Sequence, residues 1–268
     1  RWHWFSWWGF IGCLILMMFY TTVGGWMLSY VVKMGTGAFN GLDAAGSAEV
    51  FGTMLANPGE LIGWMLAVCV IGFLVCSMGL QKGVERITKV MMTCLLLVMV
   101  VLVVRSLTLP GAQAGIEFYL IPDFGKLFAG ETAAEQWATF GNAVYAAMGQ
   151  AFFTLSIGAG GMLIFGSYLG KDRSLPGEAV RIAGVDTLVA LMAGLIIFPA
   201  CFAFGVEPGS GPGLVFITLP SVFEQMPLGQ LWCTLFFLFM SFAALSTVVA
   251  VFENIMSFSM DQWGTPRK

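Results

Sequence analysis

Long apolar segments recur along this chain, and they constrain its fold more than any other feature of the sequence. A helix needs about 20 consecutive apolar residues to cross the roughly 30 Å hydrocarbon core of a bilayer. Six segments have that character, at residues 7–32, 61–80, 90–104, 137–169, 182–204 and 228–252. Only 10% of the 268 residues are charged and the mean hydropathy is +0.87, whereas a soluble domain carries about 25% charged residues. We therefore predict an all-α integral membrane protein, with six transmembrane helices in a single domain over residues 1–268.

The charged and sulfur-containing residues exclude several classes of function. The net charge of −3 and the lack of a long Lys/Arg run argue against nucleic-acid binding. All six cysteines lie inside apolar stretches without the spacing of a metal site, so we expect unpaired packing residues. His3 is the only histidine and stands near the start of the chain, whereas a membrane enzyme needs several converging reactive groups. The sequence predicts neither an enzyme nor an organic cofactor.

The basic residues sort to the two sides of the membrane if the six spans alternate in direction. One side then receives Arg1, Lys82, Arg86, Lys89, Lys171, Arg173, Arg181, Arg267 and Lys268, and the other receives Lys33, Arg105 and Lys126. Short cytoplasmic loops carry an excess of Lys and Arg. We therefore predict a multi-pass protein of the cytoplasmic membrane with its short basic loops in the cytoplasm.

Three longer connections separate the spans, at residues 35–60, 109–135 and 205–229. The first is rich in glycine, alanine and acidic residues, and the second holds an amphipathic piece around residues 118–128. The third contains Gly-Pro-Gly at 211–213 and then a short apolar run that ends at Pro220. Because proline and glycine interrupt regular structure, we expect a re-entrant or interfacial hairpin in this third connection.

The fourth span carries the residues that most strongly indicate a binding site. Between Phe152 and Gly161, three glycines and two hydroxyl side chains occur together in mid-span. Each glycine costs a helix about 1 kcal/mol relative to alanine, and backbone groups freed in a membrane need protein or a wet cavity as partner. Broken helices of this kind expose carbonyls and helix ends to ions and substrates in secondary transporters. The alternative is a small-residue face for close helix packing, but Thr154 and Ser156 beside the glycines favour a site.

Several motifs resemble the neurotransmitter:sodium symporter family, in the order in which that family carries them. The segment Gly149–Ser156, followed by Gly158 and by Ser167-Tyr168, is similar to the family's sixth helix. Phe19-Tyr20 with Trp26 resembles its third helix, Gly83–Arg86 with Lys89 the start of its fifth, and Phe242–Thr247 its eighth; Asp186–Ala190, Gly194 and the loop Gly211–Phe216 resemble bacterial members. The resemblance implies helices three to eight of a LeuT-type inverted-repeat bundle, unwound at mid-membrane in the fourth span. It also implies that the family's first two and last helices are absent from these 268 residues.

The resemblance assigns substrate binding to residues of three spans. Tyr20 and Phe153 would close over an amino-acid substrate, whose side chain would meet an apolar wall. The residues implied are Leu16, Tyr20, Phe153, Thr154, Ser156, Ala159, Thr247 and Val251. Because this wall carries no charge and an unpaired buried charge is strongly disfavoured, we expect a hydrophobic or aromatic amino acid.

Two sodium sites are implied by the same resemblance. Thr154 and Asp186 belong to one, and the carbonyl of Ala243 with the hydroxyls of Ser246 and Thr247 belongs to the other. Such oxygens are hard ligands, which suit a hard cation. For an isolated Ser or Thr, a hydrogen bond to the preceding helical turn is the alternative role. Each site lacks the ligands that the absent first helix would supply.

Polar side chains inside the apolar spans need partners or solvent. A carboxylate such as Asp186 costs roughly 2.5–3.5 kcal/mol at a helix centre, so we expect a functional partner or, nearer the cytoplasm, water or Arg181. Glu253 and Asn254 lie near the end of the sixth span, where we expect a solvated helix end.

The sequence thus predicts sodium-coupled symport of a hydrophobic or aromatic amino acid by alternating access. The expected partners are sodium ions, the amino acid and the lipid bilayer. The alternative is a structural or channel-like scaffold without ion coupling, which has no need of a break in mid-membrane. Because half of each ion site would come from the missing first helix, we expect the chain alone to be inactive.

Overall fold

The computed structural model describes residues 2–78, 85–158, 161–170, 173–205 and 211–264. All regular structure within these ranges is helical, which confirms the predicted all-α class. Five of the described helices are long and apolar enough to span a membrane: α1 (Trp2–Gly35), α3 (Pro58–Ser77), α4 (Arg86–Leu107), α9 (Leu175–Ala203) and α11 (Gly229–Trp263). They coincide with five of the six predicted spans. Most of them extend beyond the predicted ends, because helices continue past the apolar part that lipid covers.

The remaining predicted span, residues 137–169, is an interrupted helix. It consists of α7 (Ala133–Thr154) and α8 (Gly161–Ser167), separated by non-helical residues. α7 begins with a capping box, in which the Thr132 hydroxyl accepts from the Glu135 amide and a Glu135 carboxylate oxygen accepts from the Thr132 amide. Such a box satisfies amide groups that an α-helix leaves free at its start. The interruption lies where the glycines and hydroxyls predicted it.

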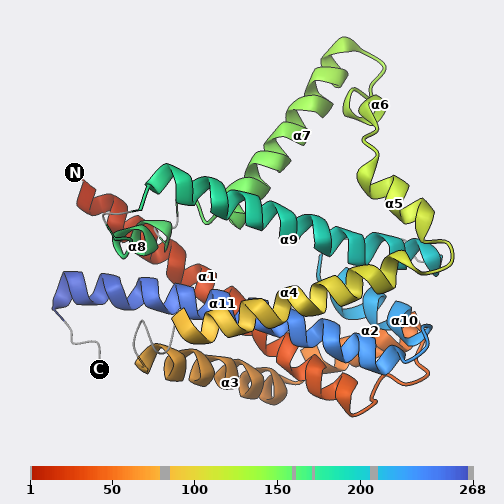
Figure 1. Cartoon of the computed structure of the whole chain (residues 1–268), viewed down its shortest axis with the longest axis horizontal. Helices are drawn as coiled ribbons and strands as arrows, with labels where there is room; N and C mark the ends of the chain where they lie inside the picture. The colour runs from red at the N-terminus through yellow and green to blue at the C-terminus, as the bar shows by residue number, and fades with distance from the viewer. Residues whose placement is uncertain (1, 79–84, 159–160, 171–172, 206–210, 265–268) are drawn as a thin grey trace.

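Helices α1 and α11 pack along each other and form the centre of the bundle (Figure 1). α3 and α4 flank this pair, and α9 packs against α4. α7 projects away from the bundle, and none of its side chains is buried. The break between α7 and α8 therefore lies where an outlying helix returns to the central pair.

The long connections contain helices that the sequence did not indicate. They are α2 (Ala44–Leu55), α5 (Ala112–Leu120), α6 (Phe124–Leu127), the π-helical turn η2 (Leu214–Thr218) and α10 (Leu219–Glu224). The apolar run does not end at Pro220, because proline is tolerated in the first turn of a helix and α10 continues to Glu224. This segment is also buried rather than interfacial: Phe216 is 2% exposed and its carbonyl accepts from the Tyr30 hydroxyl at 3.0 Å.

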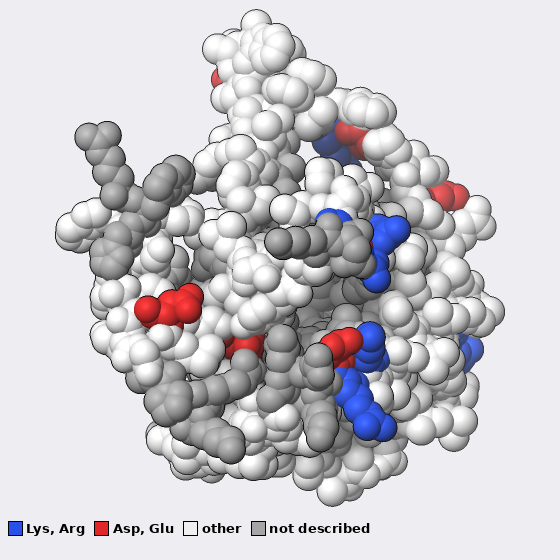
Figure 2. Space-filling model, turned by 60° about the vertical axis from the view of Figure 1, so that its left-hand side comes forward, with Lys and Arg blue, Asp and Glu red and all other residues white. Residues whose placement is uncertain are grey.

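Most of the described basic residues lie near the ends of the long helices, and Lys126 lies apart from them on α6. The starts of α4 and α9 lie at the same end of the molecule as the start of α1 and the end of α11 (Figure 1). Figure 2 shows this face, with Lys and Arg in small groups beside acidic residues on a largely uncharged surface. The pairs include Lys89 with Glu85 at 3.0 Å and Arg181 with Glu178 at 2.9 Å. Five other basic residues assigned to this side, Arg1, Lys82, Lys171, Arg267 and Lys268, lie outside the described residues.

Glycine allows α3 and α11 to approach closely. A Cβ on Gly72 would lie 2.6 Å from Cε2 of Phe252 and 3.1 Å from Cγ1 of Val248. The Phe252 ring is itself stacked on Phe73, with ring centroids 4.2 Å apart. A side chain at position 72 would therefore displace a ring that packing holds in place.

We predict that Gly72→Ala lowers the free energy of unfolding by about 1–3 kcal/mol, the usual effect of overpacking. Gly63 on the same helix is the matched control, because a Cβ there meets nothing within 4 Å. Gly63→Ala should be neutral or stabilising by up to about 1 kcal/mol, through helix propensity. Thermal unfolding of both variants in detergent makes the comparison, and equal melting temperatures would contradict this account of the α3–α11 contact.

Candidate functional site

The break between α7 and α8 turns the chain through two left-handed residues. Ser156 has φ of 52° and Gly158 has φ of 91°. Glycine adopts this conformation readily, whereas for serine it costs roughly 1–2 kcal/mol. The Leu155 amide still bonds to the carbonyl of Ala151, so regular pairing is lost only beyond that residue. The break therefore has a defined local geometry, which includes a strained serine.

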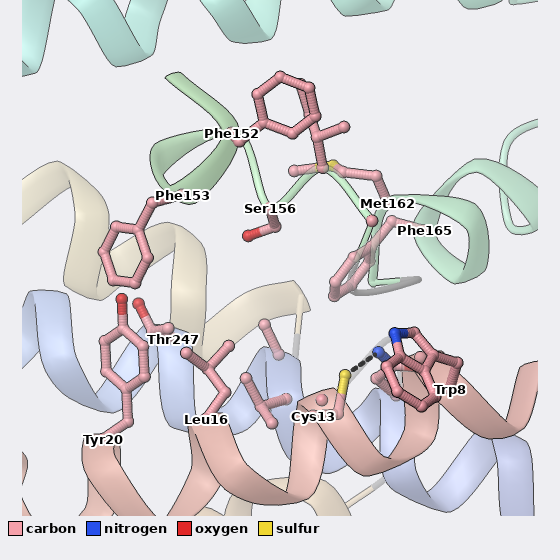
Figure 3. A pocket seen from close by; sticks show the side chains of 17 residues that line it. Trp8, Cys13, Leu16, Tyr20, Phe152, Phe153, Ser156, Met162, Phe165 and Thr247 are labelled. Atoms are coloured by element: carbon pink, nitrogen blue, oxygen red, sulfur yellow. Dashed lines mark hydrogen bonds between the residues drawn. The ribbon is translucent and has the colours of Figure 1, made fainter. Parts of the chain in front are cut away.

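A cavity of about 460 Å³ lies between the break, α1 and α11. Six of the eight residues predicted to bind substrate line it: Leu16, Tyr20, Phe153, Ser156, Thr247 and Val251. Figure 3 shows the hydroxyl groups of Tyr20, Ser156 and Thr247 directed into the same space. We call it the central cavity. Thr154 is not among its lining residues, and Ala159 lies outside the residues that the structure describes.

Tyr20 and Phe153, the two residues predicted to close the site, lie together on one side of the central cavity (Figure 3). Their rings are nearly parallel, at 9°, with centroids 6.5 Å apart. No hydrogen bond joins the Tyr20 hydroxyl to another described residue, although a phenol in an apolar helix usually has a partner. The pair thus combines two aromatic faces with one hydroxyl that is available to a ligand.

Thr154 binds Asp186 across the gap between α7 and α9. Its hydroxyl lies 3.0 Å from each carboxylate oxygen, and donates to this carboxylate. Asp186 is therefore bound to a protein group, the Thr154 hydroxyl, and not to Arg181. The Arg181 guanidinium binds Glu178 instead. A hydroxyl and a carboxylate together form an oxygen-only group of the kind that hard cations prefer.

The hydroxyls of Ser246 and Thr247 both donate to the carbonyl of Ala243, at 2.8 and 3.1 Å. This is the back-bonding expected of hydroxyls within a helix. It also brings three oxygens together within one turn of α11. A cation bound here would compete with two hydrogen bonds for the same carbonyl.

The prediction of a solvated end for Glu253 and Asn254 is wrong. Both are buried, Glu253 completely. The Tyr168 hydroxyl donates to Glu253 at 2.9 Å and lies 2.8 Å from the hydroxyl of Ser257, and the Asn254 amide donates to the Cys13 sulfur at 2.8 Å. Because α11 continues to Trp263, these residues lie inside a packed helix and not at its end.

Four of the six cysteines are buried and two are half-buried, so they pack within the apolar helices. Several lining residues were missed by the sequence analysis. On α1, Trp8 and Gly12 extend the line of Leu16 and Tyr20 at intervals of four residues, so helical periodicity from Tyr20 could have found them. Phe165 of α8 also lines the cavity, and no motif or periodicity pointed to it.

Comparison with known proteins gives the family. A sequence profile described as the sodium:neurotransmitter symporter family matches residues 48–268. This chain belongs to that family. The motif resemblance is therefore confirmed, and the chain is part of an integral membrane protein.

Two bacterial relatives and one solved structure are similar over nearly the whole chain. An uncharacterized sodium-dependent transporter of Bacillus subtilis, YhdH, is 40% identical over 95% of this chain and 54% of its own length. One of Haemophilus influenzae is 34% identical over 93% of this chain and 53% of its own length. The crystal structure of MhsT in complex with L-phenylalanine superposes with a TM-score of 0.85 and 36% identity, covering all of this chain and 58% of MhsT. The chain thus spans about half the length of its relatives and adopts the fold of MhsT.

We predict that Ser156→Gly raises the free energy of unfolding by about 0.5–1 kcal/mol, because glycine removes the left-handed strain at some entropic cost. Ser156→Ala is the control, since alanine retains the strain and should not stabilise. Thermal unfolding in detergent measures both. A Ser156→Gly variant that is less stable than the wild type would show that the serine is not strained.

Proposed function

We propose that the protein that carries this chain is a symporter in which sodium entry drives the uptake of a hydrophobic or aromatic amino acid. The observation that carries the proposal is the break between α7 and α8, which opens beside an apolar cavity and two groups of oxygen atoms. Membership of the sodium:neurotransmitter symporter family supports it. A purely structural scaffold has no use for a broken helix in mid-membrane.

Transport of this kind needs no covalent step. The described residues contain no group of three or more His, Cys, Asp or Glu side chains that could hold a metal ion for catalysis. Each polar group of the site instead has a binding role. The substrate carboxylate would approach the Tyr20 hydroxyl, and its ammonium group would meet backbone carbonyl oxygens at the break.

Sodium is a co-substrate in this proposal, and its ligands are oxygens of this chain. Thr154 and Asp186 would contribute to one site, and Ala243, Ser246 and Thr247 to the other. In both, a sodium ion would replace hydrogen bonds that the residues now make with one another. The remaining ligands would come from outside this chain, because its relatives are about twice as long. We therefore expect no uptake by the 268 residues alone.

The orientation follows from the basic residues. If the starts of α4 and α9 face the cytoplasm, as the positive-inside rule requires, Arg86, Lys89 and Arg181 lie on the cytoplasmic side. Lys33 and Arg105, near the other ends of α1 and α4, then face outward. In this orientation the break lies between the two surfaces of the cytoplasmic membrane.

The cavity wall indicates the class of substrate. Leu16, Phe153 and Val251 give the central cavity an apolar lining, and a charged substrate side chain would be buried there without a partner. By family resemblance Ala159 replaces a phenylalanine of a leucine-selective relative, which leaves space for a larger side chain. Similarity to MhsT, solved with L-phenylalanine, supports an aromatic or large aliphatic amino acid.

Competition for sodium-dependent uptake tests this proposal in the protein at its natural length. Tryptophan, phenylalanine, tyrosine and leucine should compete better than glycine and alanine, and replacing sodium by potassium should abolish uptake. Ala159→Phe should weaken tryptophan far more than alanine, by roughly 1–3 kcal/mol per methylene-sized group excluded. A wild type that prefers glycine, or a variant with unaltered preference, would contradict the assigned pocket.

From the fixed negative charge of Asp186, we predict that transport does not require chloride. By family resemblance it occupies the position of an amide sodium ligand in chloride-dependent members, where a bound anion balances the cations. A fixed carboxylate supplies that negative charge itself. Uptake should be unchanged when gluconate replaces chloride, and Asp186→Asn should abolish uptake or make it need chloride. Strict chloride dependence of the wild type would refute this role.

A further inference from the structure

The wall that α1 and α11 give to the central cavity is polar at both ends and apolar between them. The two helices run in opposite directions along each other (Figure 1), so their side chains meet in successive levels. The three levels are Tyr20 with Thr247, Leu16 with Val251, and Cys13 with Asn254. Figure 3 shows Tyr20, Leu16 and Cys13 in this order along α1. The hydroxyl level belongs to the proposed substrate site, whereas the third level has no role in it so far.

The third level is a buried polar pair whose bond is easily exchanged. Cys13 is 2% exposed and Asn254 is 9% exposed, and the Asn254 amide donates to the Cys13 sulfur at 2.8 Å. A thiol sulfur is a weak acceptor, whereas a carboxamide has both a strong acceptor oxygen and N–H donors. The Asn254 N–H can therefore pass from the sulfur to a hydroxyl oxygen, which is the stronger acceptor. Its place in the cavity wall makes Asn254 available to a neutral polar group of a bound molecule.

The spacing of the levels fits one long side chain. Tyr20 and Cys13 are seven residues apart, which corresponds to about 10 Å along a helix. An amino acid with its carboxylate at the Tyr20 hydroxyl would lay its side chain along Leu16 and Val251 toward Asn254. An aromatic side chain, with a hydrogen bond of about 3 Å at each end, can bridge this distance. The described residues of the cavity wall include no charged side chain, so the tip of the substrate must be neutral.

We propose that Asn254 is a specificity-determining residue, which hydrogen-bonds the polar tip of an aromatic substrate and so favours tyrosine over phenylalanine. The inference rests on the proposed function, because it takes the central cavity as the site of the transported amino acid. A phenol both donates and accepts, so it matches a carboxamide. Phenylalanine fits the same apolar level but leaves Asn254 bound to Cys13, and it gains no hydrogen bond at its tip.

Competition for the sodium-dependent uptake of labelled L-phenylalanine tests the inference in the protein at its natural length. The competitors are unlabelled phenylalanine, tyrosine and para-methylphenylalanine, which has the size of tyrosine but no hydroxyl group. One neutral hydrogen bond makes a modest net contribution, so tyrosine should inhibit at a concentration about two- to tenfold lower than phenylalanine. Para-methylphenylalanine should inhibit no better than phenylalanine, because it lacks the group that Asn254 would bind.

Variants of the third level assign the preference to Asn254. Asn254→Leu keeps a side chain of similar size without the amide, so the preference for tyrosine should disappear while phenylalanine still inhibits. Cys13→Ala removes the sulfur and leaves the amide, so the preference should remain. Ser259→Ala is the matched control on α11, because the Ser259 hydroxyl bonds to the carbonyl of Ile255 and does not line the central cavity. It should leave the preference unchanged.

Equal inhibition by tyrosine and phenylalanine in the wild type would overturn the inference, and so would para-methylphenylalanine that inhibits as well as tyrosine. An unaltered preference in Asn254→Leu would also overturn it. If Asn254→Leu does not fold, the three competitors in the wild type decide the question alone. The proposed function fails in a different way, namely if the wild type shows no sodium-dependent uptake that hydrophobic amino acids inhibit. Equal inhibition by the two aromatic amino acids would refute the role of Asn254 and leave the proposed function standing.

Discussion

The interior of a bilayer offers no hydrogen bonds, so a backbone that leaves its helix there must find partners in the protein or in water. This constraint governs the structure around residues 155–158, where α7 has ended and α8 has not begun. The break is accommodated because α1 and α11 enclose a cavity beside it, lined by the hydroxyls of Tyr20 and Thr247. The amides of Ser156 and Ile157 bond back to the carbonyls of Phe153 and Phe152, so the end of α7 is closed within the protein while the cavity beside it stays open to a ligand.

Helix α11 holds two neighbouring elements through buried polar bonds. It binds α8 and its C-terminal end through Glu253 and Tyr168, and it binds α1 through Asn254 and Cys13. Buried polar bonds of this kind fix the relative positions of helices when all their groups are satisfied. α7, in contrast, is tied to α9 through Thr154 and Asp186 and has no buried side chain. The two halves of the broken helix are therefore held by different partners, as alternating access would require.

The overall class and the break could be predicted from the sequence because each depends on local composition. Apolar runs indicate lipid contact, and the glycines after Thr154 weaken a helix wherever it lies. The lid pair of Tyr20 and Phe153 came from family resemblance, and the structure places both rings on one cavity. Whether they bind substrate stays a prediction.

Other features could not be predicted because they depend on contacts between distant segments. Glu253 was expected in solvent. The residue that binds it in the interior, Tyr168, lies 85 residues earlier in the chain, so the local sequence did not reveal the contact. Thr154 and Asp186, 32 residues apart, were brought together in advance only by the family resemblance. The short α10 was missed because hydropathy does not distinguish a segment buried in protein from one at an interface. Phe165 gave no signal, since only the three-dimensional position of α8 places it beside the central cavity.

The central claim is that the break between α7 and α8 is where sodium and the amino acid bind. Hydrogen–deuterium exchange of the peptide that covers residues 155–158 tests it most directly, in the protein at its natural length, in detergent. Three of these amides are already hydrogen-bonded to carbonyls of α7, and we predict that their exchange slows further when sodium and L-phenylalanine are both present, and changes little with either alone. Exchange at 155–158 that does not respond to sodium and phenylalanine together, under conditions in which the protein binds the amino acid, would contradict the account.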